Sequence, residues 1–327
     1  MSTSASENRT PPDLVRRMMS TFAVPPNADG DFLEPLNATI GRASKPFVEI
    51  GNALRANIEG LISTVSVPYT LAQQAATDRH WQSILTAERI RSQMIDANPD
   101  ETQEELELRR EREALKIATS KMKSFLCSPE GTDVLVRNTV AFLESLRSKE
   151  AVLRAANELI LQGVVLCWGT FEVLARDCFV VHLNMKPSRT LVLLEDPVAK
   201  RRFELSKVAL ETLASHNFNL SERMGSVLAE RQDLSDVYSV KSVYQALFAD
   251  NKALADALND SDLRLLSLRR NLIVHRCGVI DTEYATAANC SQKIGERLTA
   301  SPDNLEKHLI TIMKVASNIL DAVSAAT

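Results

Sequence analysis

The stretch RRNLIVHRCGVID at residues 269–281 places three chemically capable side chains, Arg270, Asn271 and His275, in an aliphatic segment. A histidine can accept and donate a proton near neutral pH. An arginine presents a planar, permanently charged fork that matches phosphate oxygens, and an asparagine can orient either group by hydrogen bonds. RNA carries its own nucleophile, the 2′-hydroxyl. A base beside that hydroxyl and a cation beside the phosphate can therefore suffice to cleave it.

A helix over residues 261–277 is expected to carry these side chains. Ser261 is a good N-cap residue, and Gly278 can end the helix in a left-handed turn. At about 100° per residue, Asn271 and His275 share one edge of this helix, whereas Arg270 lies about 140° from His275. Arg270 therefore either extends along the surface to water or points into a cleft.

The spacing by itself is also compatible with ordinary structural roles. An Arg and a His separated in this way occur by chance in roughly a third of chains of this composition. His275 would then cap the last carbonyls of its helix, and Arg270 would be a surface residue.

The longer string RNLIVHRCGVID resembles the signature of HEPN-domain proteins (higher eukaryote and prokaryote nucleotide-binding). In that signature an Arg, commonly followed by a polar residue, precedes a His by a short apolar run. Arg270, Asn271 and His275 match it in type and order. A second stretch, LCWGTFEVLARDCFVVHLN at residues 166–184, resembles an earlier core helix of the family in which a Trp and a Glu are common. These are Trp168 and Glu172 here.

The region of Tyr284 and Gly295 is similar to the group that includes the RiboL-PSP-HEPN-like proteins. The resemblance covers about residues 150–327 and implies an up-and-down helical bundle. It also implies a homodimer in which two Arg/His sets share one cleft. Active members of the family are metal-independent endoribonucleases, often toxins or antiviral-defence effectors, whose products carry a 2′,3′-cyclic phosphate.

The resemblance also implies roles for individual residues. His275 would be the general acid/base, Arg270 would hold the scissile phosphate, and Asn271 would orient both groups. Glu172 would either help to orient His275 or pair with Arg176 one turn later. We therefore expect a cytoplasmic enzyme that acts on RNA without a metal or cofactor, with an antitoxin or defence-system protein as a possible partner. The alternatives are a catalytically inactive HEPN-like interaction or nucleotide-binding module, and a helical scaffold with no pocket.

Composition favours an all-α protein. Aromatic residues make up 5% of the 327 residues, only 10 are Gly, and alternating β-branched runs are rare. The net charge of −4 excludes a strongly basic nucleic-acid-binding protein, so any RNA contact must come from a local patch. The five cysteines lack CxxC spacing, which predicts reduced thiols and no zinc site. The most apolar stretch, residues 159–183, contains several charged residues and predicts a buried helix rather than a membrane span.

Three regions are expected along the chain: a flexible N-terminal arm at 1–30, a helical extension at 31–148 and a HEPN-like domain at 149–327. Apolar spacing predicts long helices near 46–65, 71–97, 149–184 and 303–325. Shorter helices are expected near 200–214, 221–232 and 236–249. The segment EELELRRERE at 104–113 predicts a solvated helix with ion pairs such as Glu105 to Arg109.

Overall fold

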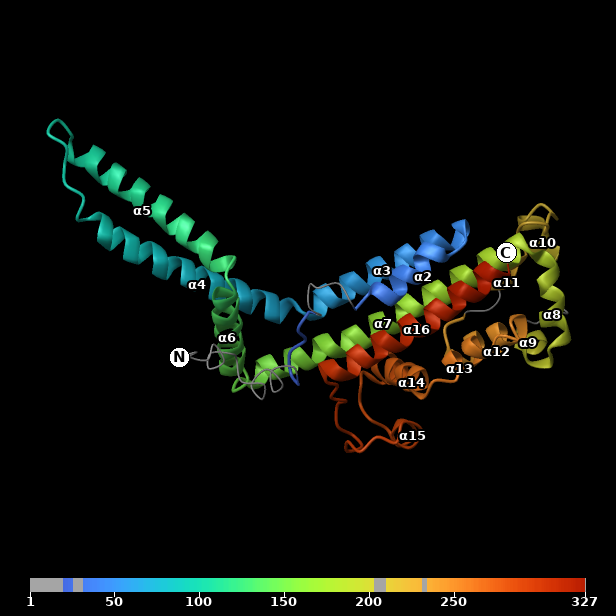
Figure 1. Cartoon of the computed structure of the whole chain (residues 1–327). Helices are drawn as coiled ribbons and strands as arrows, with labels where there is room; N and C mark the ends of the chain where they lie inside the picture. The colour runs from blue at the N-terminus through green and yellow to red at the C-terminus, as the bar shows by residue number, and fades with distance from the viewer. Residues whose placement is uncertain (1–19, 26–31, 203–209, 231–233, 327) are drawn as a thin grey trace, which may run out of the picture. The chain divides into compact units, whose positions relative to one another are not determined.

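The computed structural model describes residues 20–25, 32–202, 210–230 and 234–326. Over these ranges the chain is all-α, as predicted, and contains no sheet (Figure 1). One isolated β-bridge, between Val279 and Arg297, joins two loop segments. No helix in the described ranges is long and apolar enough to cross a membrane. The arm predicted at residues 1–30 lies almost wholly outside the described residues.

The chain divides into two compact units, each built from two separate stretches of sequence. The first contains Met1–Val24 and Ser66–Ala156, and the second contains Pro25–Val65 and Asn157–Thr327. Residues 32–65 are thus grouped with the C-terminal part of the chain, whereas the sequence analysis placed them in an extension at 31–148.

The first unit is built on an antiparallel helical hairpin, α4 (Val67–Ser92) and α5 (Gln103–Leu126), with α6 (Pro129–Leu146) packed against both (Figure 1). A capping box starts α5: Thr102 accepts a hydrogen bond from the Glu105 backbone, and the Glu105 carboxylate accepts one from the Thr102 backbone.

Some ion pairs of the first unit lie along one helix, such as Arg91 with Glu88, and others connect separate segments. Arg89 bonds Glu111 at 2.6 Å across the hairpin. The pair predicted between Glu105 and Arg109 does not form. Arg109 instead bonds Glu101 at 2.6 Å, because the turn before α5 brings that carboxylate within reach.

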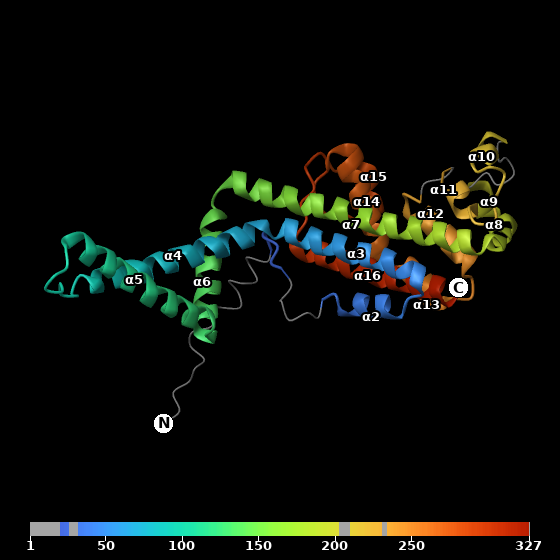
Figure 2. The same ribbon diagram turned by 90° about the horizontal axis from the view of Figure 1, so that it is seen from above.

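The second unit is a bundle formed by α2 (Glu34–Arg42), α3 (Lys45–Val65), the part of α7 (Glu150–Met185) from residue 157 onward, and α16 (Pro302–Ala325) (Figure 2). Apolar stripes bury these helices against one another; α16 alone buries Leu309, Ile312 and Ile319. A Cβ placed on Gly163 would lie 2.7 Å from the Leu305 side chain, so glycine permits the close approach of α7 and α16.

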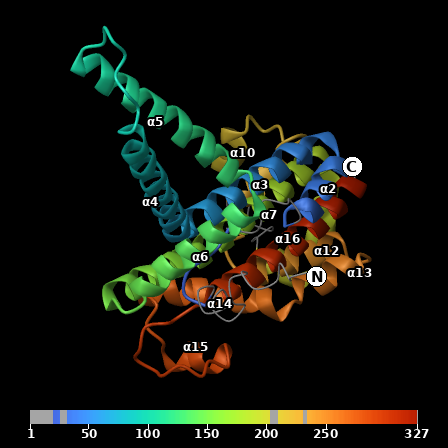
Figure 3. The ribbon, with the colours of Figure 1, turned by 60° about the vertical axis from the view of Figure 1, so that its left-hand side comes forward.

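Shorter helices complete the second unit (Figure 3). They are η1 (Pro187–Arg189), α8 (Thr190–Glu195), α9 (Pro197–Arg202), α10 (Leu210–Ser215), α11 (Met224–Ala229), α12 (Val237–Leu247), α13 (Lys252–Leu258), α14 (Ser261–Arg276) and α15 (Thr282–Ala287). The buried Tyr244 hydroxyl of α12 donates to the Ala175 carbonyl of α7 at 2.6 Å, and the Trp168 indole N–H of α7 donates to the Ser235 carbonyl at 3.0 Å.

Candidate functional site

Helix α14 has well-defined ends that set the register of the motif. Its N-cap is Asp260, one residue earlier than the predicted Ser261, and the Asp260 carboxylate accepts a hydrogen bond from the Asp262 backbone at 3.0 Å. At the other end Cys277 and Gly278 have φ values of 51° and 72°. The backbone N–H groups of both residues bond the Leu272 carbonyl. The predicted left-handed ending is confirmed, and it starts one residue before the glycine.

The rotation of α14 is fixed by its contacts with α16, to which it runs antiparallel. Lys314 of α16 bonds Asp260 at the start of α14 at 3.4 Å, and His308 of α16 bonds Arg269 nine residues further along α14. Leu266 and Ile273 are buried on the inner side. Asn271 and His275 therefore lie on the exposed side of the helix.

Arg270 is directed towards α7. Its Nη2 atom is 3.9 Å from Oε2 of Glu172, and the two side chains are 23% and 29% exposed. Its Nη1 atom donates to Oδ1 of Asn271 at 3.1 Å. The structure thus brings together three residues that the sequence selected from two separate stretches. The guanidinium keeps contact with water and is only loosely held by the carboxylate.

The exposed His275 lies one turn beyond Asn271. Within the described part of the chain, no hydrogen bond joins His275 to Arg270 or Asn271. Arg270 and His275 occupy different parts of the α14 surface, so one copy of the chain does not bring the two groups together as a pair.

The adjacent arginine takes the opposite direction, which the sequence did not reveal. Arg269 turns inward, and its Nη1 atom lies 2.9 Å from Nε2 of His308, a residue that is 1% exposed. Burial, assisted by the charge of Arg269, lowers the pKa of His308 to about 3. The available signal was the position of His308 between Leu305 and Leu309 on the apolar stripe of α16.

Residues 277–301, which we call the α15 loop, follow the motif directly. The Ile280 backbone donates to the Glu296 carbonyl and the Leu298 backbone donates to the Gly278 carbonyl, at 2.9 and 2.8 Å. Arg297 of this loop donates to the Cys277 carbonyl at the end of α14. The loop is therefore an ordered structure joined to the helix that carries the motif.

Two acidic residues near the motif have distinct partners. Asp281 caps α15 by accepting a hydrogen bond from the Tyr284 backbone at 2.7 Å, and it lies 3.5 Å from Arg276. The ion-pair partner of Arg270 is Glu172. Arg270 is consequently bridged to the neighbouring helix α7 and not to the loop that follows its own helix.

Two cavities lie elsewhere in the second unit. One of about 660 Å³ is lined by residues that include Arg189, Phe248 and Lys252, and one of about 580 Å³ lies beside Tyr238 and Lys241. Neither is lined by a predicted site residue. Among the described residues, no group of three or more His, Cys, Asp and Glu side chains is placed to hold a metal ion.

Comparisons of the chain with protein-family models, with curated proteins and with solved structures found no match. The case for a function therefore rests on the residues of the chain itself.

Proposed function

We propose that the protein is a metal-independent endoribonuclease of HEPN type. The observation that carries the proposal is the placement of Arg270, which lies within reach of Glu172 and Asn271 and remains partly open to water. A half-buried guanidinium that is only loosely paired can exchange its carboxylate partner for a phosphate oxygen. The exposed His275 on the same helix adds an imidazole ring, which can serve as a proton acceptor and donor.

In the proposed reaction, His275 takes the proton of the RNA 2′-hydroxyl, and the 2′-oxygen attacks the adjacent phosphorus. The P–O5′ bond breaks, which leaves a 2′,3′-cyclic phosphate on one product. The departing 5′-oxygen takes a proton from water and becomes a 5′-hydroxyl on the other product, and His275 returns its proton to the solvent. Arg270 balances the charge on the phosphate oxygens in the transition state, and Asn271 holds the guanidinium in place.

We further propose that two copies assemble across the exposed faces of α7 and α14. Leu166 and Val173, on either side of Glu172 along α7, are 46% and 49% exposed, and Val274 on α14 is 47% exposed. A side chain added at Gly169 would touch nothing within 4 Å, so the surface between the two α7 residues is open. Exposed apolar side chains next to a polar site are typical of contact surfaces. A twofold assembly would let His275 of one copy act with Arg270 of the other.

The biological setting completes the proposal. A toxin or antiviral-defence effector acting in the cytoplasm would be held inactive by an antitoxin or another defence-system protein. RNA is the proposed substrate, and the proposed chemistry uses only side chains of the protein.

One observation favours a second candidate, a catalytically inactive HEPN-like interaction module. Arg270 already has a carboxylate partner, and the two cavities described above are lined by other residues. In that case, the surface of α7 and α14 would bind a partner protein or a nucleotide without cleaving it.

The deciding experiment compares the wild-type protein with the Arg270→Ala/His275→Ala double variant and with Arg276→Ala. Arg276 is an exposed arginine directly after His275, so its variant controls for loss of charge. Purified proteins are incubated with RNA in the presence of a chelator, and growth of the expressing cells is followed. We expect cleavage and growth arrest from the wild type and from Arg276→Ala, with a loss of about 10²–10⁴-fold in the double variant. Equal RNA integrity with all three proteins would exclude the nuclease and leave the interaction module.

A further inference from the structure

A buried contact lies directly behind the candidate site and has no part in the proposed reaction. The Arg269 guanidinium donates from Nη1 to Nε2 of His308 at 2.9 Å. An arginine can only donate, so Nε2 of His308 must be the unprotonated nitrogen of a neutral ring. Burial and the charge of Arg269 keep the ring in that state by lowering the pKa of His308 to about 3.

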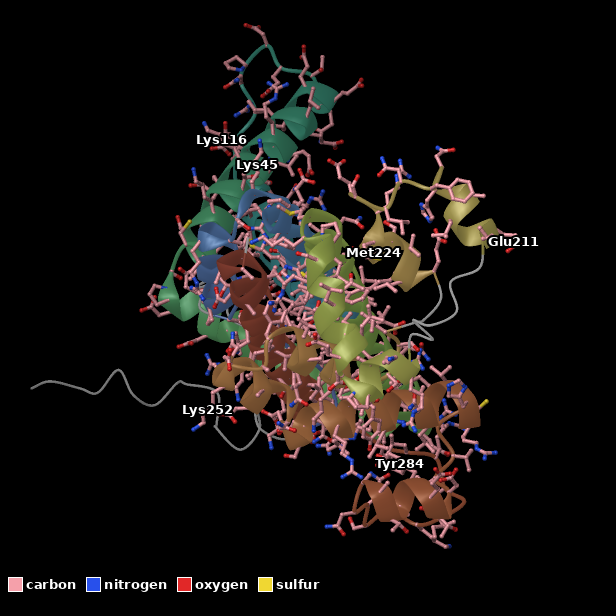
Figure 4. The ribbon with its side chains drawn as sticks, turned by 90° about the vertical axis from the view of Figure 1, so that its right-hand side faces the viewer. Lys45, Lys116, Glu211, Met224, Lys252 and Tyr284 are labelled. Carbon is pink, nitrogen blue, oxygen red and sulfur yellow. The ribbon has the colours of Figure 1, made fainter. Side chains whose placement is uncertain are left out.

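The same guanidinium acts on Tyr284 of α15, which is labelled in Figure 4. Burial raises the pKa of the Tyr284 phenol, and the hydrogen bonding and charge of Arg269 oppose this rise. The hydrogen bond of Arg269 itself joins α14 to α16. In the described ranges of the chain, no carboxylate lies within 4.0 Å of Arg269, and its side-chain hydrogen bond goes to the neutral ring of His308.

Retaining a half-buried cation without an acidic partner is costly for stability, which indicates a role in fixing geometry. Arg269 immediately precedes Arg270 in α14, and successive residues of a helix point about 100° apart. The contact of Arg269 with His308 fixes the rotation of α14 about its axis. It therefore also fixes the direction of Arg270 and the exposure of His275.

We propose that Arg269 is a positioning residue, which holds Arg270 and His275 in one arrangement through its contact with His308. This inference rests on the proposed nuclease only for its activity measurement. The structural part of the inference is that the contact of Arg269 with His308 orders the exposed side of α14. This part can be measured without any substrate.

The test uses His308→Leu and His308→Gln in the full-length protein. Leucine fills a similar volume but accepts no hydrogen bond, whereas the glutamine carbonyl can accept one from Arg269. His182→Leu is the matched control, because His182 is also 1% exposed and neutral but contacts Phe248 instead. We expect His308→Leu to lower kcat at least tenfold with KM nearly unchanged. His308→Gln should recover most of the loss, and His182→Leu should keep the wild-type kcat.

Backbone hydrogen exchange over residues 270–276 is measured in parallel. We expect faster exchange in His308→Leu than in either His308→Gln or His182→Leu. If His308→Leu folds with unchanged kcat and unchanged exchange, the inference is overturned. If it does not fold, Arg269→Met, which removes the guanidinium that bonds His308, is measured in its place and must show faster exchange than wild type. If the wild type cleaves no RNA, the nuclease proposal fails, and the exchange data alone then support or overturn the role of Arg269.

Discussion

Arg297 of the α15 loop and Glu158 of α7, which are 139 residues apart in sequence, form a two-point salt bridge. Nε and Nη2 of the guanidinium each donate to one carboxylate oxygen, and Nη1 donates to the Cys277 carbonyl. The bridge therefore joins the end of the motif helix to the longest helix of the chain.

We expect Glu158→Gln to lower the free energy of unfolding of the protein by about 0.5–1 kcal/mol. The reduction is modest because both side chains are more than 40% exposed, at 43% and 41%, so that water screens the pair. The interaction energy between the two side chains is measured by urea unfolding of Glu158→Gln, Arg297→Gln and the double variant. Additive effects of the two single changes would show that the bridge contributes nothing.

Acid should destabilise the second unit before most carboxylates are protonated. Burial lowers the pKa of His182 to about 4, with the charges of Arg189 and Lys186 adding to the effect, and the pKa of His308 to about 3. Between the unfolded value of about 6.5 and these folded values, the unfolded chain binds more protons. The stability contributed by the neutral rings is therefore complete above pH 6.5 and is lost as the pH falls below it.

We expect a loss of roughly 1–2 kcal/mol per histidine between pH 6.5 and pH 5. Chemical denaturation at a series of pH values tests this expectation. His182→Gln and His308→Gln should each make the free energy of unfolding depend less steeply on pH. The double variant should reduce this pH dependence further. A wild-type unfolding free energy that is constant over this range would contradict the assignment of two neutral buried rings.

Substitution of Arg270 by lysine tests how the proposed site binds phosphate. Lysine keeps the positive charge but loses the planar fork that can hold two oxygens at once. We expect Arg270→Lys to cleave RNA at least tenfold more slowly than wild type, and we expect addition of a chelator to change neither rate. Full activity in Arg270→Lys would mean that a point charge is sufficient, and inhibition by a chelator would contradict metal independence.

A charge placed on the exposed apolar surface of α7 tests the proposed assembly. We expect Val173→Asp to convert a dimer into a monomer, measured by light scattering after size-exclusion chromatography. Leu191→Asp is the matched control, because Leu191 is 60% exposed on α8 and should tolerate the charge. A wild-type protein that is monomeric at all concentrations, or a Val173→Asp variant that remains dimeric, would place the contact elsewhere or exclude it.

Local signals predicted the all-α fold and the longest helices. The expected helix at 149–184 is observed at Glu150–Met185, because its apolar residues repeat continuously over many turns. The short helices α13 and α15 were not predicted. Each is only six or seven residues long and is started by one capping side chain, Asn251 or Asp281. Such a segment has too few residues to show a helical period.

Long-range contacts determined what could not be predicted. The sequence selected Arg270, Asn271 and Glu172, which the structure brings together. The opposite directions of Arg269 and Arg270 depend on the rotation of α14, and His308, which fixes that rotation, follows Arg269 by 39 residues. No pattern within the motif carries this information. The packing of α2 and α3 with residues 157–327 depends in the same way on contacts across most of the chain.

The discontinuous second unit has a consequence for synthesis on the ribosome. Arg42 at the end of α2 pairs with Asp321 of α16, and the two residues are separated by 279 positions. At roughly 5–20 residues per second, α2 and α3 leave the ribosome roughly 15–60 s before the last helix that covers them. During that interval the apolar sides of α2 and α3 are accessible to chaperones. The hairpin of α4 and α5 is continuous in sequence, so it is synthesised completely before α16 and can fold first.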